Sequence, residues 1–208
     1  MALVKYNNNS ISAVTSAASI PSGALTLIKT LTASSSATLS FVDGSDGVVL
    51  DSTYPIYKFE FINIHPENDN TDGFEFNVSI DGGSNYNVAK TTTFFQAYNK
   101  ETGDAAALEY LTSFDLAQGT GFQTIGRKVG NDNDQSCAGT LTLFSPSSTT
   151  FVKHFLSQAN SYIAADYSIN IFVAGYANTT SAVNAIQFKM PSGNIDAGKI
   201  KLYGIKDS

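Results

Sequence analysis

The chain has 208 residues and a formal net charge of −6, with no tryptophan and a single cysteine, Cys137. This length fits one large all-β domain or two small ones, and charged residues make up 14% of the chain, well below the roughly 25% typical of soluble domains. The chain has no run of basic residues, and its one local basic pair is Arg127-Lys128. We therefore expect no nucleic-acid partner, because binding to a phosphate backbone needs clustered Lys and Arg.

Residues 1–22 contain many small polar residues and no sustained alternation, so we expect an N-terminal arm rather than a part of the core. Asn, Ser and Thr interrupt the apolar stretches of this segment, which is not typical of a signal peptide. No apolar run approaches the roughly 18 residues of a membrane span. The sequence therefore predicts neither a cleaved signal nor insertion into a membrane.

The rest of the chain, residues 23–208, follows the two-residue period of strands that turn one face toward a core. Strands are predicted at residues 24–31, 37–42, 57–61, 74–80, 140–143, 167–173, 186–190 and 199–205. Clusters of Gly, Asn and Asp, which favour turns, separate them. Crossover helices are missing, which excludes a parallel α/β fold. We therefore expect a single all-β domain, an antiparallel β-sandwich of jelly-roll type.

Helical character is confined to residues 100–121, "KETGDAAALEYLTSFDLAQGTG". No apolar face with a period of 3.6 residues is long enough for more than one short helix there. The predicted domain therefore contains at most one short helix, in a long excursion between strands.

Acidic residues gather in several of the predicted turns, including a group of Glu67, Asp69 and Asp72. Calcium takes about six to eight oxygen ligands from such side chains, but no turn matches the EF-hand pattern. Asp is also a default turn residue, so we expect turns rather than metal sites and no cofactor. The weak metal candidates are Asp43, Asp46, Asp132 and Asp134.

Nothing in the sequence specifies a reaction. No Gly-x-Ser-x-Gly elbow is present, and His65, His154 and Cys137 are too few for a metal site of the zinc type. Cys137 is expected to be a small buried side chain. A pair of carboxylates for glycoside hydrolysis can come from any part of a chain, which leaves a depolymerase as a third interpretation. We expect a protein that is not an enzyme.

Five tyrosines lie in or near predicted loops, where they would contact a glycan or fill a subunit interface. Tyr is enriched in interfaces, and this interpretation is favoured over stacking on sugars. The five are Tyr86, Tyr98, Tyr110, Tyr162 and Tyr176.

Two segments carry a resemblance to known proteins. Residues 179–208, "TTSAVNAIQFKMPSGNIDAGKIKLYGIKDS", combine a Thr-Ser-Ala-Val approach, a Ser-Gly-Asn-Ile turn and a last strand with Leu-Tyr-Gly-Ile-Lys. Residues 61–87, "FINIHPENDNTDGFEFNVSIDGGSNYN", contain an earlier hairpin and a Gly-Ser-Asn-Tyr turn. In this order and spacing the chain resembles a family of bacteriophage virion proteins, tail-fibre and head-accessory components among them.

The resemblance implies a structural component of the virion, a surface-exposed tail or capsid accessory protein that acts by assembly. Its partners would be other virion proteins and copies of itself, with a trimer favoured, and host-surface glycan as a further target. The protein would be made in the host cytoplasm and located in the virion, with the arm docked onto other virion proteins. The alternative function is a lectin-like carbohydrate-binding module for host glycans.

Overall fold

The computed structural model of the chain describes residues 25–69 and 73–206. The described residues form twelve strands and one 3-10 helix, η1 (Thr112–Phe114). The strands are β1 (Leu25–Thr32), β2 (Thr38–Val42), β3 (Ile56–Pro66), β4 (Phe74–Ser79), β5 (Lys90–Lys100), β6 (Ala106–Tyr110), β7 (Gln123–Gly126), β8 (Cys137–Phe144), β9 (Lys153–Ile163), β10 (Tyr167–Ala177), β11 (Ala185–Lys189) and β12 (Ile195–Ile205).

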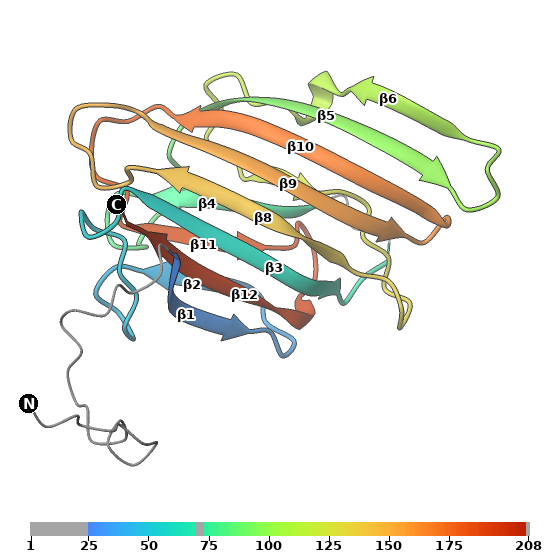
Figure 1. Cartoon of the computed structure of the whole chain (residues 1–208), viewed down its shortest axis with the longest axis horizontal. Coiled ribbons are helices and arrows are strands. Elements are labelled where there is room, and N and C mark those ends of the chain that lie inside the picture. The colour runs from blue at the N-terminus through green and yellow to red at the C-terminus, as the bar shows by residue number, and fades with distance from the viewer. Residues whose placement is uncertain (1–24, 70–72, 207–208) are drawn as a thin grey trace, which may run out of the picture.

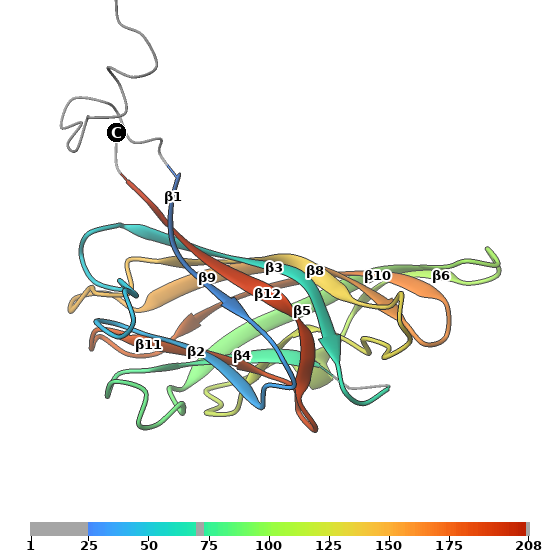
Figure 2. The ribbon, with the colours of Figure 1, turned by 90° about the horizontal axis from the view of Figure 1, so that it is seen from below.

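The strands build two antiparallel sheets that pack face to face, which confirms the predicted all-β sandwich. The large sheet has eight strands in the order β1-β12-β3-β8-β9-β10-β5-β6, and the small sheet has four in the order β2-β11-β4-β7. Figure 2 shows the sheets as two layers, with β2, β11 and β4 below the large sheet. The chain alternates between the layers, except that β5 and β6, and then β8, β9 and β10, follow one another within the large sheet.

Aromatic side chains from both sheets meet in the core between the layers. Phe188 of β11 lies 5.3 Å from the ring of Phe61 and 5.4 Å from the ring of Phe59, both on β3. Phe41 of β2 contacts the same two strands through Phe59 and Phe188. All four rings are almost fully buried, and contacts of this kind bind the layers together by apolar burial and edge-to-face ring packing.

The two layers differ in width. Strands β9, β10, β5 and β6 continue the large sheet beyond β8 (Figure 1), and β7, at the edge of the small sheet, contacts β9 and β10. The small sheet has only four strands, so it does not cover much of the inner face of β9, β10, β5 and β6. We call these four strands the flank.

The predicted final strand lies in the interior of the large sheet. β12 pairs with β1 on one side and β3 on the other, and its Ile200 and Leu202 are fully buried. Gly204 faces Tyr54 so closely that an added Cβ would lie 2.4 Å from the tyrosine ring. Leu202 and Gly204 of the Leu-Tyr-Gly segment therefore face the core, while Tyr203 between them is half-buried.

Two features of the prediction need correction or extension. Residues 106–110, inside the segment with helical character, form strand β6, and the one helix there is the 3-10 helix η1 of three residues. Strands β5, β7 and β9 were not predicted. The predicted arm, residues 1–22, lies outside the described residues. Among the described residues, no helix is long and apolar enough to cross a membrane.

Candidate functional site

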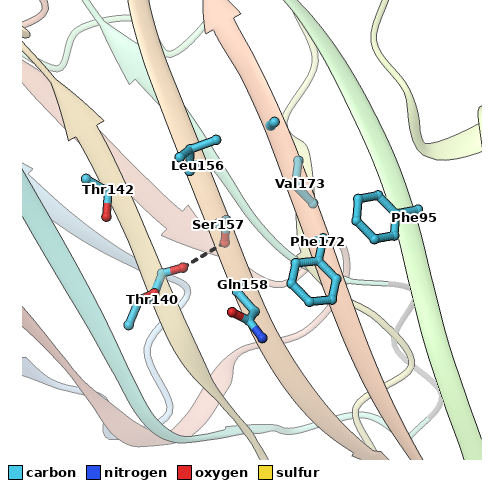
Figure 3. Close-up of a pocket in the computed structure, with 9 residues that line it drawn as sticks. Phe95, Thr140, Thr142, Leu156, Ser157, Gln158, Phe172 and Val173 are labelled. Atoms are coloured by element: carbon cyan, nitrogen blue, oxygen red, sulfur yellow. Dashed lines mark hydrogen bonds between the residues drawn. The ribbon is translucent and has the colours of Figure 1, made fainter.

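The outer face of the flank is the first candidate surface, and it has an aromatic centre. Phe95 of β5 and Phe172 of β10 are opposite each other in the strand register, and their rings stack with centroids 4.9 Å apart and an angle of 9° between planes. Figure 3 shows the two rings side by side on the sheet, with Leu156 on the neighbouring strand. Leu156 is 54% exposed and Phe95 39%, so water covers apolar groups here.

Small side chains between the larger ones leave hollows in this face. Ala174 lies opposite Leu156 on β9 and Thr93 on β5. Two open hollows, of about 360 and 290 Å³, meet at Leu156 and Ala174. Ser157 is turned to the other side and donates a hydrogen bond to the carbonyl oxygen of Thr140, 2.9 Å away (Figure 3).

Formal charge is missing from the outward positions of β8 and the flank. Alternation places at these positions Ala138, Thr140, Thr142, Phe144, His154, Leu156, Gln158, Asn160, Tyr162, Ser168, Asn170, Phe172, Ala174, Tyr176, Thr91, Thr93, Phe95, Ala97, Asn99, Ala106, Leu108 and Tyr110. None of these is Asp, Glu, Lys or Arg. The outward positions of β3, by contrast, include Lys58 and Glu60, which form an ion pair. We call this surface the charge-free face.

A second candidate site lies on the inner side of the flank, where its polar groups converge. Gln96 of β5 is 1% exposed, and its amide is bonded at both ends. Its Oε1 accepts from Nη1 of Arg127 at 3.2 Å, and its Nε2 donates to Oε2 of Glu109 at 3.1 Å. A buried amide with a hydrogen bond at each end has a fixed orientation. Gln96 therefore positions Arg127 and Glu109 beside the same cavity.

The guanidinium of Arg127 is fixed from a second direction. It lies 5.1 Å from the centroid of the Phe114 ring, and Phe114 in turn stacks on Phe94 of β5 at 4.9 Å. Nε of Arg127 is buried and has no hydrogen-bond partner among the described residues. The side chain is thus held between an aromatic ring and an amide, with N–H groups left over.

These groups line a cavity of about 360 Å³. Tyr98 and Tyr167 form one wall, with ring centroids 5.6 Å apart in an edge-to-face arrangement. The remaining lining comes from Gln96, Glu109, Arg127, Lys128, Ile163, Ala165 and Ile169. A concave site with apolar walls and a few converging polar groups is the usual form of a small-ligand site. We call it the Arg127 pocket.

The structure separates the five predicted tyrosines. Tyr110, Tyr162 and Tyr176 lie in strands and point outward on the charge-free face, where Tyr176 contacts the exposed His154. Tyr98 lies on the opposite side of the sheet, in the Arg127 pocket. Tyr86 is in the loop after β4, and its carbonyl oxygen accepts from Asn77. Four of the five thus lie in strands and not in loops.

Two of the four acidic metal candidates, Asp43 and Asp46, use their carboxylates in contacts with nearby residues. Asp43 accepts from the backbone N–H of Leu50 at 2.8 Å, and Asp46 forms an ion pair with Lys29 at 3.0 Å. Asp132 and Asp134 lie in the turn before β8, where the backbone carbonyl oxygen of Asp132 accepts from the backbone N–H of Gln135. Among the described residues no three His, Cys, Asp or Glu side chains are grouped as a metal ion would require.

Two buried titratable groups lie elsewhere in the fold. Cys137 is fully buried, as predicted, and burial raises the pKa of its thiol to about 11. Lys90 is fully buried too, and its Nζ donates to Oδ1 of Asn77 at 2.5 Å and to the carbonyl oxygen of Val88 at 2.9 Å. Burial lowers the pKa of Lys90 to about 7. Neither group faces the Arg127 pocket or the charge-free face.

Comparison with known proteins adds no relative: no protein-family model, no curated protein and no solved structure matches this chain. Of the residues of the Arg127 pocket, sequence reasoning named Tyr98 as a glycan or interface contact, and it noted Arg127-Lys128 only as the one local basic pair. It missed Gln96, Glu109 and Tyr167, because no local pattern shows that three separate strands bring these side chains to one cavity.

Proposed function

We propose that the chain is a structural component of a bacteriophage virion, a surface-exposed tail or capsid accessory protein that acts by assembly. The observation that carries the proposal is the charge-free face. Exposed Leu156, Phe95 and Leu108, the last 74% exposed, lie on it without one formal charge. Protein interfaces are depleted of charged residues at their centre and enriched in aromatic ones, and large exposed apolar patches mark association sites.

The fold supports the resemblance on which the proposal also depends. The two segments that carry it, residues 61–87 and 179–208, lie side by side, because β3 pairs with β12 and β4 pairs with β11. They therefore form one continuous part of the sandwich. The order β1-β12-β3-β8 opposite β2-β11-β4-β7 suits a jelly roll with two inserted hairpins, β5–β6 and β9–β10, and jelly rolls occur in viral capsid proteins.

The assembly in this proposal is a homo-oligomer, with a trimer favoured, whose subunits meet through the charge-free face. The arm, residues 1–22, docks onto other virion proteins. Antibodies raised against the purified chain test the location. We expect them to label particles purified from cells that carry the gene, at regular positions on the surface. Particles that lack the chain by immunogold labelling and by peptide mass spectrometry would overturn the proposal.

A second function, recognition of host-surface glycan, is favoured by one observation, the Arg127 pocket. Its aromatic wall and its arginine, glutamate and glutamine side chains match the apolar C–H faces and the hydroxyl groups of a sugar ring. The pocket lies on the side of the flank opposite to the charge-free face, so a particle-bound subunit keeps it available. A glycan array probed with the purified protein tests this function, and an array with no bound glycan of any kind contradicts it.

A further inference from the structure

We propose that the Arg127 pocket binds a sugar that carries a carboxylate, a uronic or sialic acid unit of a glycan. This inference rests on the glycan recognition proposed above and specifies its ligand.

The charged groups of the pocket have no ion-pair partners. Arg127, Lys128 and Glu109 are absent from the salt bridges among the described residues. Two cations and one anion remain, which leaves an excess of positive charge at one open hollow of the surface. A guanidinium binds a carboxylate through parallel N–H···O bonds, and the one hydrogen bond of Arg127, to Gln96, leaves most of its N–H groups for a ligand.

Whereas Arg127 needs an anion, Glu109 needs hydrogen-bond donors from the ligand. Its Oε2 accepts from Gln96, and its remaining lone pairs need donors, which the hydroxyl groups of a sugar provide. The Gln96 amide lies between Glu109 and Arg127, and hydrogen bonds of 3.1 and 3.2 Å join it to the acceptor and to the cation. A ligand that satisfies both needs an anionic group and hydroxyl groups on one small frame, as an acidic sugar has.

The same arrangement disfavours other ligands. A phosphate or sulfate group offers charge without several hydroxyl donors and leaves the Glu109 carboxylate without partners, while a neutral sugar leaves the excess positive charge unpaired. The rings of Tyr98 and Tyr167 give the ring face of a sugar an apolar surface, which acetate or another small anion cannot use. The volume of about 360 Å³ is at the lower end of ligand cavities, which suits a single terminal unit.

The test is an NMR titration of the isotope-labelled full chain with D-glucuronate, N-acetylneuraminate, D-glucose and acetate at constant ionic strength. We expect the two acidic sugars to shift backbone amide signals of Gln96, Glu109 and Arg127 with dissociation constants in the millimolar range. D-glucose and acetate should bind at least about tenfold more weakly, a difference of about 1.4 kcal/mol.

Three variants give the test its controls. Arg127→Met should weaken the acidic sugars at least about tenfold and leave D-glucose unchanged, and Glu109→Gln should weaken all the sugars. Lys199→Met removes an exposed cation of β12 and should change nothing. Because Arg127 is half-buried, the amide spectrum of each variant is first compared with that of the parent and should be unchanged outside the pocket. Binding of D-glucose to the Arg127→Met variant shows that the pocket of this variant is intact.

Each other outcome decides against the inference. D-glucose binding as strongly as the acidic sugars would leave glycan recognition standing and overturn the acidic ligand. Acetate binding as strongly as D-glucuronate would show an anion site and not a sugar site. Failure of all the sugars to bind would overturn both the inference and glycan recognition, while the proposed assembly role, which depends on the other face, would stand.

Discussion

The rings of Phe95 on β5 and Phe172 on β10 lie side by side and nearly parallel, with centroids 4.9 Å apart, on the outer surface of the large sheet (Figure 3). Phe95 is exposed and Phe172 is half-buried, and an aromatic pair contributes about 0.5–1.5 kcal/mol beyond its buried area. It has a larger effect when a partner removes it from water, because interface energies concentrate in central aromatic residues. A substitution in this pair should therefore weaken assembly more than it weakens the fold of the subunit.

Substituting Phe172→Asn should weaken self-association while the fold remains. We expect the dissociation constant of the oligomer to rise about tenfold or more and the free energy of unfolding to fall by about 0.5–3 kcal/mol. Light scattering coupled to size exclusion and urea unfolding measure the two quantities. The matched control is Phe151→Asn, since Phe151 is 73% exposed and lies in the loop before β9. Equal loss of association in both variants would contradict the role of the charge-free face.

Strands β5, β6 and β9, which sequence reasoning missed, contribute to both candidate sites together with the predicted strand β10. β12 and β3 alternate clearly, because one face of each meets an apolar core. β9 reads "KHFLSQANSYI" and β5 reads "KTTTFFQAYNK", and polar residues occupy both faces of each. Ser157 and Gln96 are buried although polar, while Leu156 and Phe95 are exposed although apolar. A pattern that depends on one apolar face cannot show such strands.

The candidate sites were less predictable from the sequence than the core strands, because many of their residues lie on strands without one apolar face. Tyr98 and Tyr110 belong to one hairpin, β5–β6, but the first lines the Arg127 pocket and the second lies on the charge-free face. Residue type alone does not distinguish the two sides of a sheet, and the strand register does. That register depends on pairing between β5 and β10, a tertiary contact that has no local signal.

Leu202→Ala tests whether the final strand belongs to the core. Leu202 is fully buried between the layers, so the substitution should lower the free energy of unfolding by about 2–5 kcal/mol. Lys201→Ala, at the half-exposed neighbouring position, should change it by less than about 0.5 kcal/mol. Thermal and urea unfolding of both variants give the comparison. If Leu202→Ala melts with the parent protein, β12 does not hold the position described here.

Gly204→Ala tests the close contact between β12 and Tyr54. The new Cβ would lie 2.4 Å from atoms of the tyrosine ring, and overpacking of this kind costs about 1–3 kcal/mol. The Tyr54 ring is itself held by an edge-to-face contact with Tyr57 at 5.7 Å, so it cannot move away freely.

A double-mutant cycle isolates this contact. In a Tyr54→Ala background, where the obstructing ring is gone, Gly204→Ala should cost little, and the two substitutions should be non-additive by about 0.5–3 kcal/mol. Additive costs would show that the glycine is needed for a reason other than the space that the ring occupies.

Lys90 should make the stability of the protein depend on pH in the alkaline range. Burial lowers the pKa of its ammonium group from an ordinary 10.5 to about 7. Between these values the unfolded chain binds a proton at Lys90 that the folded chain does not, so the free energy of unfolding rises as pH increases. The slope contributed by this group is at most about 1.4 kcal/mol per pH unit. Its neutral amine can still donate to Asn77 and to the carbonyl oxygen of Val88, so the uncharged form keeps its hydrogen bonds.

The measurement compares the parent protein with Lys90→Met by urea unfolding from about pH 7 to about pH 9. The absolute stability of the variant does not matter, because Asn77 loses a partner in it. The difference between the two slopes reports Lys90 alone, since Lys153, whose pKa burial also lowers, titrates in both proteins. We expect the parent to gain stability with rising pH relative to Lys90→Met. Parallel curves would show that Lys90 stays charged in the folded protein and that its carbonyl partners, not loss of the proton, offset the cost of its burial.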